Sequence, residues 1–320
     1  MMPRSRVRTE RHDLLRGRLE RFTRMLQGVE EGDVDALHRA RVASRRLREV
    51  LPVLQLDPDV ARKLNRRLRK ITDRLGNVRE YDVLLGVLNE LKKAGRYPKA
   101  ALPRVAAHIG ENHAHPRERL LEKVQMGELH RIASKLEKVA RTLEGSSDNR
   151  VTARHSWRWA IDARVARRAS TLAAAIADAG AVYLAERLHV VRIAVKKLRY
   201  ALELAADADQ VKSSPDLKQL RRAQDILGRL HDLQVLVDRA REVQGSLAPP
   251  DLNARRELDV LVVALEDDCR HLHGRYMQDR DALLALCARL SGPFAAAREV
   301  KAATKEVKSQ KVKLRRASTA

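Results

Sequence analysis

A chain of 320 residues with 44% hydrophobic composition can form one large domain, or two of ordinary size, around a real core. Its 65 lysines and arginines against 42 aspartates and glutamates give a formal net charge of +23, which indicates nucleic acid, an anionic membrane or another polyanion as partner. Aromatic residues make up 3% of the chain, which argues against proteins that stack single-stranded bases on aromatic rings.

The N-terminal residues 1–8 are basic, and no apolar segment of the kind found in secretory signals follows them. No apolar run further along the chain is long enough to cross a bilayer. We therefore expect a soluble, cytoplasmic protein without a membrane partner. Cys269 and Cys287 form no CxxC pair and are expected to be reduced, buried apolar residues.

Apolar residues recur at helical spacing along nearly the whole chain, and alternating strand patterns are absent. The pattern therefore predicts an all-α fold. Pro52 should end or kink the helix around it, and Asp33 is placed to cap the helix that follows it. Helix breaks are expected at residues 28–33, 57–58, 95–103, 113–116, 145–149, 180, 207–215, 245–251 and 291–293.

The helix after Asp33 carries a one-sided row of positive charge. His38, Arg41, Arg45 and Arg48 stand at i, i+3, i+7 and i+10, so they stack on one face. A helical projection puts this row directly beside the apolar face, where cations are partly desolvated. Such cations repel one another unless carboxylates or an anionic ligand pair with them. Basic residues one turn apart, about 5 Å of rise, suit a ligand with repeated phosphates.

A second motif, LGNVREYDV, follows at residues 75–83. Asp82 projects onto the apolar face of its helix, where we expect it to orient an arginine. The helix before the motif adds a basic flank formed by Lys63, Arg67, Lys70 and Arg74.

Both motifs return in the same order in the second half of the chain. LGRLHDLQV at residues 227–235 resembles the segment at 75–83, and the helix before it offers Arg221 and Arg222. A second basic row has the same spacing as the first and also lies directly beside an apolar helix face. It consists of His189, Arg192, Lys196 and Arg199.

The repetition predicts an internal duplication. Residues 1–145 and 151–292 are expected to form two pseudo-symmetric antiparallel helical bundles, joined by a linker at residues 146–150. Residues 298–320 are rich in lysine and poor in apolar residues, so we predict a basic, disordered tail.

These segments resemble the CHAD family, the conserved-histidine α-helical domains. The resemblance rests on HRARVASRRLR at 38–48, the run at 75–83, and LHVVRIAVKKLRY at 188–200, and it covers about residues 5–290. It implies two bundles around a basic central groove or pore that binds inorganic polyphosphate, and association with polyphosphate granules is a further expectation. Family members are often joined to a CYTH triphosphatase domain. The sequence has no ExExK motif, so we expect a stand-alone, non-catalytic protein that needs no cofactor or metal.

The residues expected to bind polyphosphate combine the basic rows, their flanks and the positions that the resemblance adds. They are His38, Arg41, Arg45, Arg46, Arg48, Lys63, Arg67, Lys70, Arg74, Arg79, His189, Arg192, Lys196, Lys197, Arg199, Arg221 and Arg222. His231 and Gln234 stand where the first half has Arg79 and Asp82, so the second copy of that site is expected to be degraded.

Two other functions stay open at this point. A nucleic-acid-binding protein is supported by the total charge and the tail, although the chain has no recognition motif of that class. Weak nucleic-acid binding through the basic surface is expected in either case. A histidine phosphotransfer or phosphohydrolase enzyme is suggested by His38 and His189, but no acidic cluster resembles a magnesium site for phosphoryl transfer.

Overall fold

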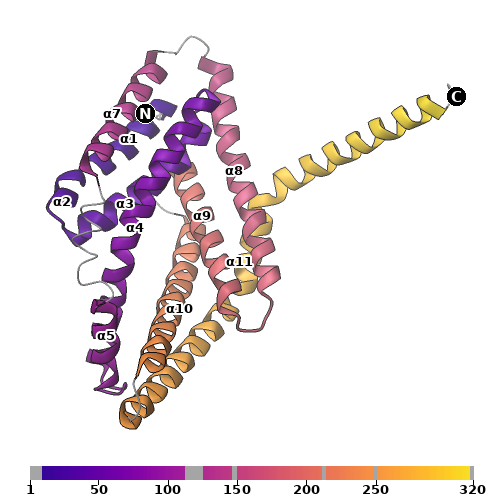
Figure 1. The fold of residues 1–320 in the computed structure, drawn as a ribbon. Helices are drawn as coiled ribbons and strands as arrows, with labels where there is room; N and C mark the ends of the chain where they lie inside the picture. Colours follow the sequence, from indigo (N-terminus) through magenta and orange to yellow (C-terminus); the bar gives the residue numbers. More distant parts are fainter. Residues whose placement is uncertain (1–8, 112–124, 146–149, 211–213, 248–250, 318–320) are drawn as a thin grey trace, which may run out of the picture.

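The computed structural model describes residues 9–111, 125–145, 150–210, 214–247 and 251–317, and it describes the backbone alone at 77–81, 111, 150–156 and 293–317. The described part of the chain is helical and contains no strand, which confirms the all-α prediction (Figure 1). The helices are α1 (Arg11–Thr23), α2 (Leu26–Glu30), α3 (Val34–Val50), α4 (Pro58–Ala94), α5 (Ala101–Glu111), α7 (Met126–Gly145), α8 (Arg150–Ala179), α9 (Ala185–Ala208), α10 (Pro215–Ser246) and α11 (Leu252–Ala317), with a 3-10 turn at Leu51–Val53.

Local chemistry sets the ends of these helices. The Asp33 side chain caps α3 by accepting a hydrogen bond of 2.5 Å from the Ala36 amide. Pro52 falls in the 3-10 turn that follows α3, and α8 ends before Gly180, whose φ of +65° suits glycine. The predicted helix boundaries at these three places are confirmed.

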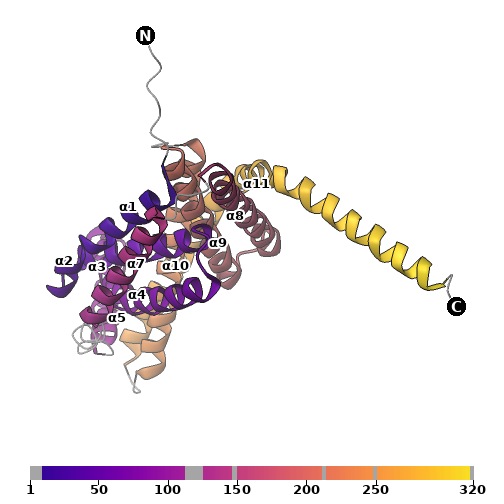
Figure 2. The ribbon, with the colours of Figure 1, turned by 90° about the horizontal axis from the view of Figure 1, so that it is seen from above.

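The C-terminal helix differs from its prediction. α11 continues through residues 291–293, so the helix break predicted there was wrong. The backbone is helical to Ala317 (Figure 2), and the disordered state of the basic tail expected at residues 298–320 stays a prediction. Alanine, lysine, arginine and glutamate are strong helix formers, and they fill this segment, so local propensity favours helix here.

The two halves of the chain pack their helices in the same pairs. In the first half, α3 contacts α1 and α4, and α7 contacts α1 and α4. In the second half, α9 contacts α8 and α10, and α11 contacts α8 and α10. The halves meet where α3 touches α9 and α4 touches α10. The linker expected at 146–150 falls between α7 and α8, and residues 146–149 of it lie outside the described residues. The internal duplication stays a prediction.

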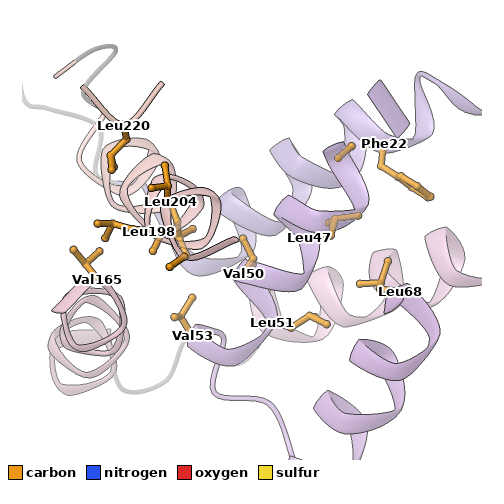
Figure 3. Packing of buried hydrophobic residues seen from close by; sticks show 14 of the residues in the cluster. Phe22, Leu47, Val50, Leu51, Val53, Leu68, Val165, Leu198, Leu204 and Leu220 are labelled. Carbon is orange, nitrogen blue, oxygen red and sulfur yellow. The ribbon is translucent and has the colours of Figure 1, made fainter. Parts of the chain in front are cut away.

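The hydrophobic core is shared by both halves. One cluster joins residues such as Leu47 and Leu68 of the first half to Val165 and Leu198 of the second (Figure 3). A second cluster joins the C-terminal part of α4 and α5 to α10 and the beginning of α11. The apolar face of α3 lies in the first cluster, which leaves the adjacent basic row at the boundary between core and solvent.

Candidate functional site: a cationic cluster between α3 and α9

The two basic rows lie together in the structure because α3 contacts α9. Lys196 of α9 is partly buried, and its pKa is lowered to about 7. Burial is the largest cause, followed by repulsion from Arg192 on its own helix and from Arg45 and Arg41 on α3. Four cations from the two halves thus occupy one partly desolvated place, which we call the cationic cluster: Arg41, Arg45, Arg192 and Lys196.

α4 contributes a glycine to the wall of this cluster. A Cβ atom at Gly76 would lie 3.1 Å from Nε and 3.3 Å from Nη2 of Arg41, which is tighter than ordinary van der Waals contact. Glycine at the second motif therefore leaves room for the Arg41 guanidinium to lie against the helix backbone. The side chain of Arg79, one turn further along α4, lies outside the described residues.

α10 contributes a histidine that sequence reasoning did not select. The His231 and His189 rings have centroids 4.5 Å apart, and their Nδ1 atoms are 3.2 Å apart. The pKa of His231 is lowered to about 4, chiefly by burial and then by the charges of Arg192, His189 and Lys196. The pKa of His189 is also lowered, most strongly by burial and then by repulsion from Arg192 and Lys196.

The position of His231 in the second motif is therefore not an empty copy of the first. Its counterpart in the first motif is Arg79, and the spacing of the motif is the signal that could have pointed to it. The neighbouring Asp232 also acts on the cluster, because its carboxylate raises the pKa of Lys196 against the stronger effects of burial and the three guanidiniums. A carboxylate therefore lies close enough to the cluster to offset part of its positive charge.

Three predicted binding residues are held by polar partners at the edges of this region. The largely buried Glu203 accepts hydrogen bonds from Arg46 Nε and Arg199 Nη1, each at 3.0 Å. Arg48 donates from Nε to Asn65 Oδ1 at 3.2 Å, and burial lowers its pKa. These contacts fix the three guanidiniums in place, and they make Arg46 and Arg199 part of the packing between α3 and α9.

The predicted basic flanks lie further out. Arg74 pairs with Glu128 at 2.5 Å, and Arg222 pairs with Asp279 at 2.9 Å. Five further predicted residues have exposed side chains on the outer faces of their helices: Lys63, Arg67, Lys70, Lys197 and Arg221. The role of these seven side chains in binding stays a prediction.

Other site chemistry finds little support in the described part of the chain. No group of three His, Cys, Asp or Glu side chains there is arranged to hold a metal ion. Cys269 and Cys287 are free and buried, as predicted, and burial raises the pKa of each thiol to about 11. Within the same residues, no helix is long and apolar enough to pass through a bilayer.

A scan against protein families matches residues 13–241 to the CHAD domain. The chain belongs to the CHAD domain family. The match begins before α3 and ends in α10, so it contains both basic rows of this CHAD domain and the complete cationic cluster. The family predicted from the two motifs is confirmed.

Solved structures agree with the family at the level of the fold. The chain is similar to PptA from Streptomyces chartreusis, with 20% identity, a TM-score of 0.58, and coverage of 84% of this chain and 97% of that one. It is also similar to the CHAD domain from the plant Ricinus communis, with 22% identity, a TM-score of 0.54, and coverage of 86% and 89%. A search of curated proteins finds no match.

Proposed function

We propose that this CHAD domain binds inorganic polyphosphate without catalysing its conversion, and that the cationic cluster between α3 and α9 is the centre of the binding site. The family as a whole relates to the binding of polyphosphate and triphosphate. One observation carries the proposal for this chain: Lys196 lies among Arg192, Arg45 and Arg41 in a partly desolvated place.

A polyanion resolves the electrostatic problem that this arrangement creates. Like charges held together at low effective dielectric repel strongly, and desolvation adds to the cost. Asp232 offsets part of that repulsion. A phosphate chain supplies the remaining negative charge, and guanidinium groups bind phosphate oxygens in bidentate geometry. Polyphosphate has no bases to stack, so a site built from cations without aromatic platforms suits it.

The test is a binding titration on the whole chain with long-chain polyphosphate, short-chain polyphosphate and duplex DNA. The critical variant is Arg45→Glu/Lys196→Glu, which reverses one charge on α3 and one on α9. Arg255→Glu/Arg256→Glu is the matched control, because it makes the same charge change on exposed residues near the beginning of α11. Thermal unfolding of both variants shows whether each is folded.

We expect the cluster variant to lose affinity for long polyphosphate by on the order of tenfold or more, and the control to change it by about twofold or less. Affinity of the wild type should also fall steeply with salt, through counterion release. Equal losses in the two variants would show that total charge alone binds the polymer. If duplex DNA displaced polyphosphate at equal phosphate concentration, nucleic-acid binding would replace this proposal. Recruitment to polyphosphate granules is the expected cellular consequence, and imaging the same two variants tests it.

A further inference from the structure

A pocket lies between α1, the turn that follows it, and α3. Its volume is about 290 Å³. Arg18 and Arg21 of α1 and Arg24 at its C-terminal cap belong to neither sequence motif, and α3 contributes part of its basic surface. The pocket is lined by Arg18, Arg21, Arg24, Met25, His38, Arg39, Val42, Ala43 and Arg46.

Arg18 is the residue that distinguishes this pocket from a solvated basic surface. Its side chain is only 2% exposed, although arginine is rarely buried to this extent. Nη2 donates to Asp207 Oδ2 at 2.8 Å, whereas Nε and Nη1 are buried and have no hydrogen-bond partner among the described residues. Buried donors without acceptors are costly, and a ligand oxygen in the pocket would satisfy them.

The carboxylates around the pocket do not balance its guanidiniums. Asp207 pairs with Arg18 and lies 3.9 Å from Arg21, and Glu203 divides its two oxygens between Arg46 and Arg199. Arg24 is exposed and pairs with no carboxylate of the described residues. Arg39 pairs with Asp35 at 3.4 Å. Three carboxylates therefore serve the five arginines of the lining, one of them shared with Arg199, so negative charge is in short supply at this place.

The inner wall of the pocket is apolar. Met25, Val42 and Ala43 line it beside the arginines, and Ala43 is buried. An inorganic phosphate chain gains little from such a wall, because it has no apolar surface to bury. A ligand with phosphates at one end and an apolar or aromatic body at the other uses both halves of the lining.

We infer that this pocket binds a compact organic phosphate, of the nucleoside polyphosphate class, independently of the cationic cluster. The phosphates contact Arg18 and the rim arginines Arg21 and Arg24, and the apolar body packs against Met25 and Val42. This inference does not rest on the proposed binding of polyphosphate.

The test is calorimetric titration with ATP and, in parallel, with inorganic tripolyphosphate, carried out in the cluster variant Arg45→Glu/Lys196→Glu so that the proposed polyphosphate site does not contribute. We expect ATP to bind more tightly, because tripolyphosphate lacks the part that packs on the apolar wall. Arg21→Glu/Arg24→Glu, at two exposed rim positions, should weaken ATP binding by about tenfold or more, and the control Arg255→Glu/Arg256→Glu by about twofold or less. Equal affinity for the two ligands, or an unchanged affinity in the rim variant, would overturn the inference.

Two further measurements locate the ligand. ATP should shift the methyl resonance of Met25, assigned with Met25→Leu, and leave that of Met277 on α11 unchanged. The cluster variant Arg45→Glu/Lys196→Glu should bind ATP within about twofold of the wild type, since it leaves the pocket lining intact. Loss of ATP binding in that variant, or a constant Met25 resonance, would place the nucleotide elsewhere and overturn the inference. The rim variant should still bind long polyphosphate with about the affinity of the wild type, which keeps the two proposals separate. Loss of that binding would show that the pocket is part of the polyphosphate site and would overturn its independence.

Discussion

The imidazole of His231 on α10 lies against that of His189 on α9, with Nδ1 atoms 3.2 Å apart. A hydrogen bond at this distance needs a donor and an acceptor, so at least one ring is neutral. Burial and the neighbouring cations Arg192 and Lys196 keep both rings neutral at ordinary pH. The pair therefore links α9, which carries the second basic row, to α10 through a contact that depends on pH.

Acid should destabilise the fold through this pair. The folded pKa of His231, about 4, is below its ordinary value of 6.5, so the unfolded state binds more protons between these values and stability falls as pH falls through that window. Between pH 6.5 and 4 the wild type should lose free energy of unfolding, and we expect His231→Gln to reduce that loss by on the order of 1–2 kcal/mol, after allowance for solvent screening. Urea unfolding at several pH values measures it. The exposed His130→Gln on α7 is the control, and a wild-type slope in His231→Gln would contradict the prediction.

Polyphosphate binding should take up a proton. In the protein without ligand, the pKa of Lys196 is about 7, below the ordinary lysine value of 10.5. A bound phosphate favours the ammonium form and therefore raises this pKa. Affinity should therefore fall as pH rises from about 7 to 9, by at most about tenfold per pH unit. Calorimetry in buffers of different ionisation enthalpy measures the uptake. Lys196→Arg should abolish it and the exposed Lys197→Arg should retain it, so equal uptake in both variants would exclude Lys196 as its source.

A methyl group at Gly76 should weaken binding while sparing the fold. It would meet the flexible end of Arg41 at 3.1 Å, so the guanidinium shifts, and the added helix propensity of alanine, up to about 1 kcal/mol, offsets the strain. We expect Gly76→Ala to lower polyphosphate affinity about three- to tenfold. The matched control is Gly86→Ala on the same helix, where nothing lies within 4 Å of the added carbon. Equal affinities for the two variants would show that the position of Arg41 is unimportant for binding.

Glu203 should matter for stability more than for binding. Its carboxylate is largely buried and accepts from both Arg46 and Arg199 at 3.0 Å, so Glu203→Gln leaves two guanidiniums without their counter-charge. We expect a loss of about 2–4 kcal/mol in the free energy of unfolding, measured with urea. Glu137→Gln, which affects the exposed pair with Arg141 on α7, should cost about 0.5 kcal/mol or less. A loss in Glu203→Gln no larger than in this control would contradict the structural role of the buried pair.

Much of the local structure could be predicted from the sequence because it depends on near neighbours. Helical spacing predicted an all-α chain, and Asp33 and Gly180 marked helix ends that the structure confirms. The apolar face of α3 is buried as predicted. The helix break at residues 291–293 was wrong, since a continuous α11 crosses it. Helix-breaking residues such as Gly292 and Pro293 are a weak signal inside a segment whose other residues strongly favour helix.

The site was only partly visible in the sequence. The rows led by His38 and His189 were recognised, but members of the first row separate in space: Arg41 and Arg45 lie near Lys196, whereas His38 lines the pocket beside Arg18. The arginines of α1 carried no motif and were missed. A helical projection gives the direction of a side chain around its own axis, and it does not say which helix lies opposite.

The sequence by itself determined the helices, the family and the two one-sided rows of positive charge, because these follow from residue types at short spacing. Only the tertiary structure decided which cations share a desolvated space and which are neutralised by carboxylates such as Glu203. The crossing of α3 and α9 does this, by joining residues about 150 positions apart in the chain, and electrostatic energy depends on distance in space and on burial.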